Sequence, residues 1–363
     1  MKYLDEFRDP RRARKVAQAI TDVTPAGREF AFMEVCGTHT MAIARYGLKK
    51  LLPPNVRLIS GPGCPVCVTP KEYVDHAVAL ARTAGVTVAT FGDMMRVPGS
   101  SADLLRLQAE GADVRVVYSA RDALDLARAE PARKVVFLAV GFETTSPTVA
   151  ATVKAAAAEG VGNFFVLTAH KLIPPAMRAL CDKDDLALDG FLCPAHVSAI
   201  IGSSAYDFVA DGYELACAVA GFEPVDILQG IYLLLKQYAD GERRVDNQYS
   251  RVVKAAGNRR AQELLAEVFE VCDSRWRGLG ELPASGSALR EEYAAFDAAR
   301  AVDVEPEETV PDRGCICGEV LTGVKMPTDC ALFGERCTPA APVGPCMVSS
   351  EGSCAAAFKY GYE

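Results

Sequence analysis

A cysteine and a histidine lie three positions apart in the stretch CGTH, which directly follows the apolar run FAFMEV. We expect Cys36 to leave a strand, Gly37 to form a turn and Thr38 to cap the helix that follows. Backbone amides at a helix N-terminus lower the pKa of a thiol and favour the thiolate. The pattern therefore favours a nucleophile or a metal ligand at Cys36 over a packed core thiol. His39 could orient a ligand, take up a proton or bond to the backbone.

A second thiol pair lies in the loop GPGCPVC, where two residues separate Cys64 from Cys67. This spacing suits a reversible disulfide, a two-thiolate metal clip or half of a zinc site. A structural zinc would need a second ligand pair of matching spacing, and this half of the sequence has none. Gly61 and Gly63 allow the backbone to approach a ligand closely. Redox chemistry or transient metal binding is therefore the favoured interpretation.

Further polar residues follow other apolar runs. Glu143 in GFETT follows VVFLAV, and a carboxylate in that place can contact a ligand or a partner loop, whereas the two threonines after it are explained as helix caps. His170 in TAHK, His196 in CPAHVS and Asp93 in FGD could transfer protons or form hydrogen bonds around the thiols. The alternative for each histidine is an ordinary structural hydrogen bond.

Six of the thirteen cysteines lie in a C-terminal segment that has no histidine and little periodicity. A bound metal centre could order such a segment, because four thiolates can hold an iron–sulfur cubane or a zinc ion. The spacing matches neither the common ferredoxins nor paired zinc knuckles, and we favour the cluster. The most evenly spaced set, which we predict as its ligands, is Cys330, Cys337, Cys346 and Cys354. Cys315 and Cys317 could supply ligands instead or form a dithiol beside the cluster.

The composition limits the class of protein. With 363 residues, half of them hydrophobic, the chain is long enough for two or three globular domains. A net charge of −8 and the absence of a basic run argue against nucleic-acid binding. The apolar stretches are too short for a membrane span, and the N-terminus is charged where a signal peptide is apolar. We therefore expect a cytoplasmic protein that uses its cysteines for metal or redox chemistry, with four isolated ones that only pack: Cys181, Cys193, Cys217 and Cys272.

Short apolar runs alternate with amphipathic stretches over the first two-thirds of the chain, which predicts parallel βαβ units. Strands are expected at residues 30–35, 56–60, 86–91, 114–119, 134–140, 163–169 and 190–193. Helices are expected at residues 41–52, 71–85, 100–111, 120–130, 144–160 and 174–181. Residues 210–300 are expected to be mostly helical, and the chain from about residue 304 to be rich in loops.

We predict the α/β class, with two Rossmann-like parallel-sheet domains and a helical, loop-rich C-terminal segment that carries an iron–sulfur cluster. The first domain covers residues 1–130 with CGTH and CPVC, the second residues 131–240 with GFETT and PAHVS, and the last segment residues 241–363. One large sheet, or an exchange of segments between the two domains, stays open. Because the carboxyl ends of parallel strands share one edge, the motifs should meet at one or two facing clefts.

Taken together, these motifs resemble one family over essentially the whole chain, that of the [NiFe]-hydrogenase maturation factor HypD. The resemblance rests on MEVCGTHTMAIARYGL, ISGPGCPVCVTP, ATFGDMMRVPGS, GFETTSPT, AHKLIPPA, CPAHVS and the C-terminal cysteine block. It implies two related α/β domains and a third segment that binds a [4Fe-4S] cluster. It further implies a scaffold on which the Fe(CN)2CO unit of the hydrogenase is built.

The resemblance also implies roles for individual residues and partners. Cys36 would hold the iron together with a cysteine of the small chaperone HypC, and HypE would supply cyanide from a thiocyanate group. Cys64 and Cys67 would act as a redox dithiol near the iron, or as further iron ligands, with electrons arriving through the C-terminal cluster. His39, Glu143 and His196 are expected to support this chemistry.

Two other functions remain as alternatives. One is a stand-alone iron–sulfur thiol–disulfide oxidoreductase, in which Cys36 only supports the dithiol. The other is an interaction protein that zinc orders. The chemistry itself favours the scaffold, because soft thiolates suit iron that carries cyanide and CO, and a dithiol delivers the two electrons that splitting a thiocyanate requires.

Overall fold

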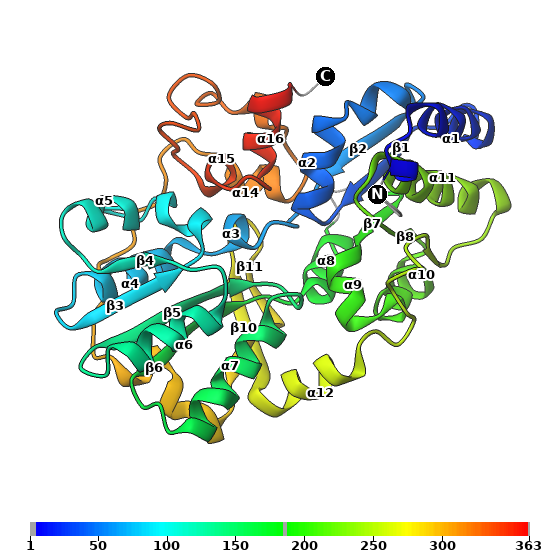
Figure 1. Ribbon diagram of the computed structural model, residues 1–363. Coiled ribbons are helices and arrows are strands. Elements are labelled where there is room, and N and C mark those ends of the chain that lie inside the picture. Colours follow the sequence, from blue (N-terminus) through cyan, green and yellow to red (C-terminus); the bar gives the residue numbers. More distant parts are fainter. Residues whose placement is uncertain (1–4, 184–186, 362–363) are drawn as a thin grey trace.

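Two parallel β-sheets organise the protein, in a computed structural model that describes residues 5–183 and 187–361 (Figure 1). Sheet A has five strands in the order β2-β1-β7-β8-β9. Their bounds are Val56–Ser60 for β2, Phe30–Glu34 for β1, Gly190–Pro194 for β7, Ala216–Ala220 for β8 and Val245–Asn247 for β9. Sheet B has four strands in the order β4-β3-β5-β6, with bounds Val114–Val116, Val86–Thr90, Lys134–Gly141 and Phe164–His170.

Helices cover both faces of each sheet, as continuously apolar parallel strands require. In sheet A, α1 (Pro10–Val23) and α11 (Pro224–Asp240) pack on one face, and α8 (Ile173–Cys181), α9 (Ala195–Ile201) and α10 (Asp207–Tyr213) line the other. In sheet B, α6 (Ala120–Ala129), α7 (Ser146–Glu159) and α12 (Arg259–Val268) cover one face, and α4 (Lys71–Ala81), α5 (Leu104–Ala109) and α13 (Ala298–Ala301) cover the other. The two sheets therefore form two three-layer units that lie side by side (Figure 1).

The remaining elements connect these units. The antiparallel hairpin of β10 (Phe269–Trp276) and β11 (Gly280–Leu289) packs beside sheet B and α8. Two short helices follow the first two strands of sheet A: α2 (Gly37–Arg45) comes after β1, and α3 (Pro65–Val68) comes after β2. The cysteine-rich segment contributes α14 (Cys317–Leu321), α15 (Pro345–Val348) and α16 (Ser353–Tyr360), which lie over α2 and α3 (Figure 1). The 3-10 turns are Asp5–Phe7, Leu48–Leu51, Gly92–Arg96, Ser203–Tyr206, Glu291–Phe296 and Pro327–Asp329.

All seven predicted strands are present, and their bounds shift by three residues at most. The expectation that residues 210–300 are mostly helical is wrong, because β8, β9, β10 and β11 lie there beside α11 and α12. The sequence of β8, ACAVA, is short and rich in alanine, a residue that is depleted in β-strands. It forms a strand because β7 and β9 pair with it on both sides.

Strand pairing follows a different division from the predicted boundary near residue 130. That boundary falls between β4 and β5, which both belong to sheet B. Residues 30–60 and 190–247 build sheet A, and residues 86–170 build sheet B, so the chain exchanges segments between the two α/β units. Hydrophobic runs mark strands in a sequence but do not specify their partners. No helix in the described part of the chain is both long and apolar enough to cross a bilayer.

Candidate functional site

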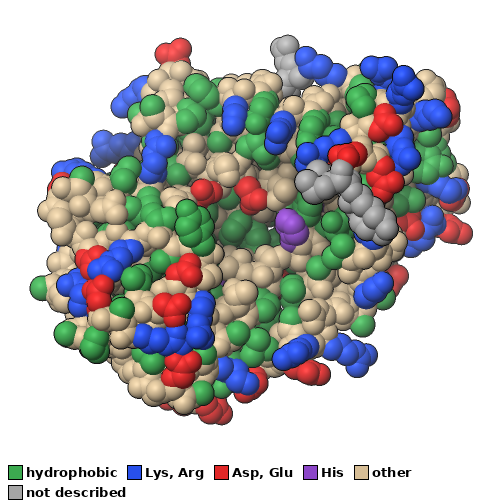
Figure 2. Space-filling view, viewed as in Figure 1, with side chains coloured by type: hydrophobic (Ala, Val, Ile, Leu, Met, Phe, Trp, Pro, Cys, Tyr) green, Lys and Arg blue, Asp and Glu red, His purple; other side chains and the backbone are tan. Residues whose placement is uncertain are grey.

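The predicted residues gather at the carboxyl edges of the two sheets. In sheet A the strand order reverses direction at β1, with β2 on one side and β7 on the other. Such a switch point leaves a crevice at the carboxyl ends of the strands where ligands bind. Cys36 follows β1 and His196 follows β7, so both residues flank this point. Figure 2 shows a hollow between the two halves of the molecule, with hydrophobic atoms at its base and acidic side chains above it.

Cys36 occupies the N-cap position of α2 and is buried. The expectation that Thr38 caps this helix is wrong, because the helix already begins at Gly37 and Thr38 lies in its first turn. The backbone N–H groups of Thr38 and His39 point to its sulfur, as the sequence predicted, and they lower the pKa of the thiol. Burial and the nearby carboxylate of Glu351 outweigh them and raise this pKa to about 12. The prediction of a lowered thiol pKa is therefore wrong, because desolvation destabilises the thiolate more than the two backbone amides stabilise it. A bound cation would reverse this balance, since metal-coordinated thiols are deprotonated.

The ring of His39 is fixed by the end of β8. Its Nε2 lies 3.0 Å from the carbonyl oxygens of both Ala220 and Gly221. Carbonyl oxygens only accept hydrogen bonds, so Nε2 carries the proton and Nδ1 keeps a free lone pair. Nδ1 is buried and has no hydrogen-bond partner among the described residues. Burial lowers the pKa of His39 to about 4, so the ring is neutral and orients its surroundings.

Phe222 is a site residue that the sequence reasoning missed. Its ring lies between two histidines, with centroids 4.9 Å from His39 and 4.1 Å from His196. His196 is exposed, and partial burial lowers its pKa. The stretch GFE that contains Phe222 follows β8 in the same way that GFE with Glu143 follows β5. This repeated GFE stretch is the sequence signal that could have identified Phe222 as a site residue.

Cys64 and Cys67 form a disulfide, with Cα atoms 5.2 Å apart at the start of α3. Both residues are buried. Of the three uses that the spacing allows, the observed bond corresponds to the disulfide. The thiols are close enough to cycle without a large movement of the backbone.

The loop that carries the disulfide packs directly on the backbone of the CGTH turn. The amide of Gly37 donates to the carbonyl oxygen of Gly63 at 2.9 Å. A Cβ atom at Gly63 would overlap the backbone of Val35 and Cys36. Glycine is therefore required at position 63 for the two thiol motifs to approach each other, and this is the close approach that the sequence suggested.

At the edge of sheet B, Glu143 and His170 are both buried and make contacts typical of structural residues. Glu143 accepts a hydrogen bond from the amide of Ile173 at 2.9 Å, and burial raises its pKa to about 7. The second oxygen of Glu143 is buried and has no partner among the described residues. His170 packs edge-on against Phe269, and neither ring nitrogen has a partner in the described chain. Burial and the charge of Lys171 lower the pKa of His170 to about 3, which matches a core histidine.

The C-terminal segment contacts the carboxyl edges of both sheets through residues 349–353. The hydroxyl of Ser349 donates to Asp93 after β3 at 2.9 Å. The hydroxyl of Thr38, in the first turn of α2, donates to Glu351 at 2.6 Å. The hydroxyls of Ser60 and Ser353 lie 2.8 Å apart. Glu351 is thus a second site residue that the sequence reasoning missed, since nothing local distinguishes it from a surface carboxylate.

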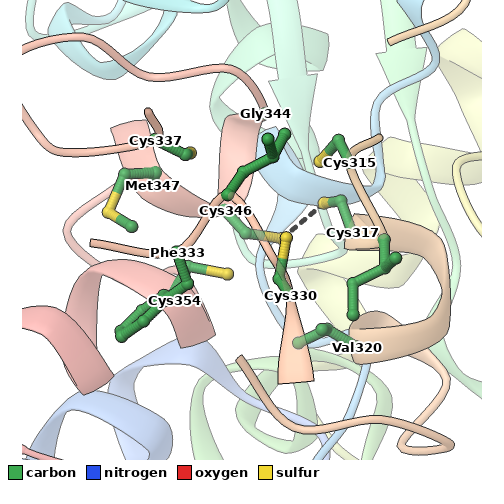
Figure 3. A pocket seen from close by; sticks show the side chains of 12 residues that line it. Cys315, Cys317, Val320, Cys330, Phe333, Cys337, Gly344, Cys346, Met347 and Cys354 are labelled. Atoms are coloured by element: carbon green, nitrogen blue, oxygen red, sulfur yellow. Dashed lines mark hydrogen bonds between the residues drawn. The ribbon is translucent and has the colours of Figure 1, made fainter. Parts of the chain in front are cut away.

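All six C-terminal cysteines line one small pocket (Figure 3). The sulfur atoms of Cys317 and Cys346 lie 2.7 Å apart. Hydrogen bonds from Cys315 and Cys346 hold the pKa of Cys317 well below its ordinary value. The structure therefore brings Cys315 and Cys317 to the thiols predicted as cluster ligands. In the described residues, no three or more His, Cys, Asp or Glu side chains already have the arrangement of a metal site.

The pocket lies next to the disulfide. The sulfur atom of Cys67 lies 3.9 Å from the carbonyl oxygen of Pro345, one residue before Cys346. Cys64, Cys67, Cys317 and Cys346 belong to one continuous buried cluster. The disulfide and these two C-terminal thiols are therefore packed in the same buried part of the molecule.

Comparisons with known proteins agree with these motifs. A family profile named HypD, described as "Hydrogenase formation hypA family", matches residues 11–361. The chain is 50% identical over 369 residues to a protein of Rhizobium leguminosarum bv. viciae named "Hydrogenase maturation factor HypD", covering 99% of this chain and 96% of that protein. Proteins of the same name from Azotobacter vinelandii and Escherichia coli (strain K12) are 48% and 46% identical, each over 99% of this chain and 97% and 98% of theirs.

Proposed function

The chain belongs to the HypD family of hydrogenase maturation factors, and from this we propose that it is the redox-active scaffold on which the Fe(CN)2CO unit of [NiFe]-hydrogenase is assembled. One observation carries the proposal, the continuity of three thiol sites. The Gly37–Gly63 hydrogen bond joins the Cys36 turn to the dithiol loop, and the contact of Cys67 with Pro345 joins that loop to the C-terminal thiols.

In this proposal the iron is cargo, and Cys36 is its ligand on this chain. A thiolate is a soft ligand that suits iron carrying cyanide and CO. Burial keeps Cys36 protonated in the absence of a cation, so iron binding must release that proton. A thiol of a small HypC-type chaperone completes the hold on the iron, and the hollow between the two halves of the molecule is the surface that such a partner would cover (Figure 2).

Cys64 and Cys67 supply the electrons for cyanide release from a HypE-type donor. Breaking the S–CN bond of a thiocyanate takes two electrons and yields a thiolate and cyanide. Oxidation of the dithiol to the disulfide provides both electrons and releases two protons, which balance these two charges. The disulfide state of Cys64 and Cys67 is the product of this step. Two electrons and two protons reopen it, and the electrons come from an external one-electron donor of the ferredoxin class.

The donor set of the C-terminal pocket fits a [4Fe-4S] cluster. Six thiols line the pocket, and the sulfur atoms of Cys317 and Cys346 lie 2.7 Å apart there. Four thiolates hold such a cluster, and the sequence nominates Cys330, Cys337, Cys346 and Cys354. When bound, the cluster supplies electrons one at a time. The chain itself adds apolar side chains to the pocket, among them Val320, Phe333 and Met347, and buries the thiols of Cys317, Cys337 and Cys346.

Infrared spectroscopy tests the scaffold. The protein is purified anaerobically with its small chaperone, and cyanide and CO stretches are expected in the wild type. Cys36→Ala should abolish these bands, whereas Cys272→Ala, a half-buried thiol on β10, should keep them. A wild type without the bands that still cycles its disulfide would instead favour a stand-alone thiol–disulfide oxidoreductase.

Iron and sulfide analysis tests the cluster. Serine substitution of Cys330, Cys337, Cys346 or Cys354 should each bleach the anaerobic protein, while Cys64→Ala should leave its colour intact. Bleaching by the Cys315 and Cys317 variants, with colour retained in the Cys330 and Cys337 variants, would move the ligand set to the other thiols of the pocket. Zinc in place of iron and sulfide would support the zinc-ordered alternative.

A further inference from the structure

Arg277 lies in the turn between β10 and β11 and caps the end of α3, the helix that contains the disulfide. Its backbone N–H donates to the carbonyl oxygen of Val68 at 2.8 Å. Its Nε donates to the carbonyl oxygen of Thr69 at 3.2 Å. These two carbonyls directly follow Cys67, so one residue fixes the exit of the dithiol helix through its backbone and its side chain.

The same guanidinium also binds the chain segment around Asp312, which leads to the C-terminal thiols. Its Nη1 donates to Asp312 at 2.8 Å, and Lys71 donates to the other oxygen of Asp312 at 2.6 Å. The three side chains are between 11% and 13% exposed. Two cations share one carboxylate, so these three largely buried side chains carry one net positive charge. Asp312 lies three residues before Cys315.

Arg277 is also adjacent to the thiols themselves. It lines one surface recess together with Cys315 and Cys317. A Cβ atom at the neighbouring Gly278 would lie 2.7 Å from the Cα atom of Gly318, so the turn touches the first helical residues after Cys317. The Nη2 atom of Arg277 is buried and has no hydrogen-bond partner among the described residues. A buried N–H group without a partner is costly, and its retention points to a negative charge that it serves.

We propose that Arg277 is a positioning residue for electron transfer: it holds the Cys64–Cys67 dithiol and the C-terminal thiols in register, and its charge favours the reduced, more negative state of the group that those thiols hold. This inference rests on the proposed function. Reduction adds one negative charge to a centre that four thiolates already make negative. A fixed cation in surroundings of low dielectric lowers the energy of that added charge.

A set of charge variants of the full-length, anaerobically prepared protein tests the inference through the midpoint potential of its iron–sulfur chromophore. Arg277→Gln should lower the equilibrium constant for one-electron reduction about tenfold, a shift of about 59 mV to more negative potential. Arg277→Lys keeps the charge and should stay near the wild type. Asp312→Asn removes an anion and should shift the potential in the opposite direction. Arg275→Gln is the matched control, because Arg275 is on the same hairpin, exposed, and paired with Glu72.

The outcomes separate this inference from the proposed function. A wild type without iron and sulfide overturns the proposed function. A wild type with the chromophore whose potential Arg277→Gln and Arg275→Gln leave equally unmoved overturns the role of Arg277 alone. Shifts of Arg277→Gln and Asp312→Asn in the same direction would also overturn it, since they would reflect loosened structure and not charge. The Asp312→Asn measurement stands even where Arg277→Gln fails to fold.

Discussion

Gly63→Ala should separate the two thiol motifs. The added Cβ would overlap the backbone of Val35 and Cys36, and backbone atoms of a strand end cannot rotate away as a side chain does. The hydrogen bond from Gly37 to Gly63 must lengthen or break in response. Because this bond joins the Cys36 turn to the dithiol loop, the substitution acts on the site without touching a thiol.

The size of the effect follows from the contact. Overpacking a close-packed region costs about 1–3 kcal/mol, and a backbone neighbour places this site near the upper end. Globular proteins gain about 2.1 cal/mol/K of entropy per residue on unfolding, or about 0.76 kcal/mol/K for 363 residues. A loss of about 3 kcal/mol then lowers the midpoint of a cooperative thermal transition by about 4 °C.

Thermal unfolding followed by circular dichroism, together with the infrared cyanide and CO bands, measures both consequences. Gly162→Ala is the matched control, because a Cβ atom there meets nothing within 4 Å. Gly61→Ala is an intermediate case, since its nearest neighbour is the flexible side chain of Met33. The bands should weaken in Gly63→Ala alone. If Gly63→Ala and Gly162→Ala have the same midpoint and the same bands, the close approach of the two loops does not matter.

Two further substitutions probe buried charge. The pKa of His170 is lowered to about 3 by burial, so its contribution to stability is complete above the unfolded pKa of about 6.5 and is lost as the pH falls towards 3. His170→Leu should therefore reduce the fall in melting temperature between pH 6.5 and pH 4.5 and preserve the value at pH 7; an unchanged pH slope would contradict this. Arg251→Ala should destabilise the protein by about 3 kcal/mol in urea denaturation, because it leaves the fully buried Asp226 without its cation. The exposed Arg300→Ala should leave the urea midpoint unchanged, and equal midpoints for the two variants would refute the reasoning.

Much of the architecture could be read from local sequence. Continuous apolar runs such as KVVFLAV predict buried parallel strands, and β5 is buried along nearly all its length. The placement of motifs after strands then predicts that they share an edge, and Cys36 and His196 do flank the switch point of sheet A. These properties depend on the covalent order of residues and on a backbone geometry that repeats every two or 3.6 residues.

Other features depend on contacts between residues far apart in the chain. Residues 216–220 became a strand because two neighbours pair with them, against the preference of their alanines. Glu351 reaches Thr38, and Arg277 reaches Val68, Thr69 and Asp312, through long-range contacts that no local sequence pattern predicts. The pairing of strands also depends on contacts between distant residues, and for this reason the boundary near residue 130 does not separate the two sheets.

The CGTH turn shows where the two kinds of information divide. The sequence by itself determined that Cys36 lies between a strand and a helix N-terminus whose amides lower the pKa of its thiol, since these features depend on its immediate neighbours, although it placed the cap at Thr38 instead of Cys36. The tertiary structure decided that the thiol is buried against the dithiol loop and near Glu351, which raises its pKa to about 12. It also decided that His39 is neutral, because burial lowers its pKa to about 4 even though the carbonyls of Ala220 and Gly221, about 180 residues away, act in the opposite direction. Desolvation and distant charges depend on the whole packed chain, so only the fold could set them.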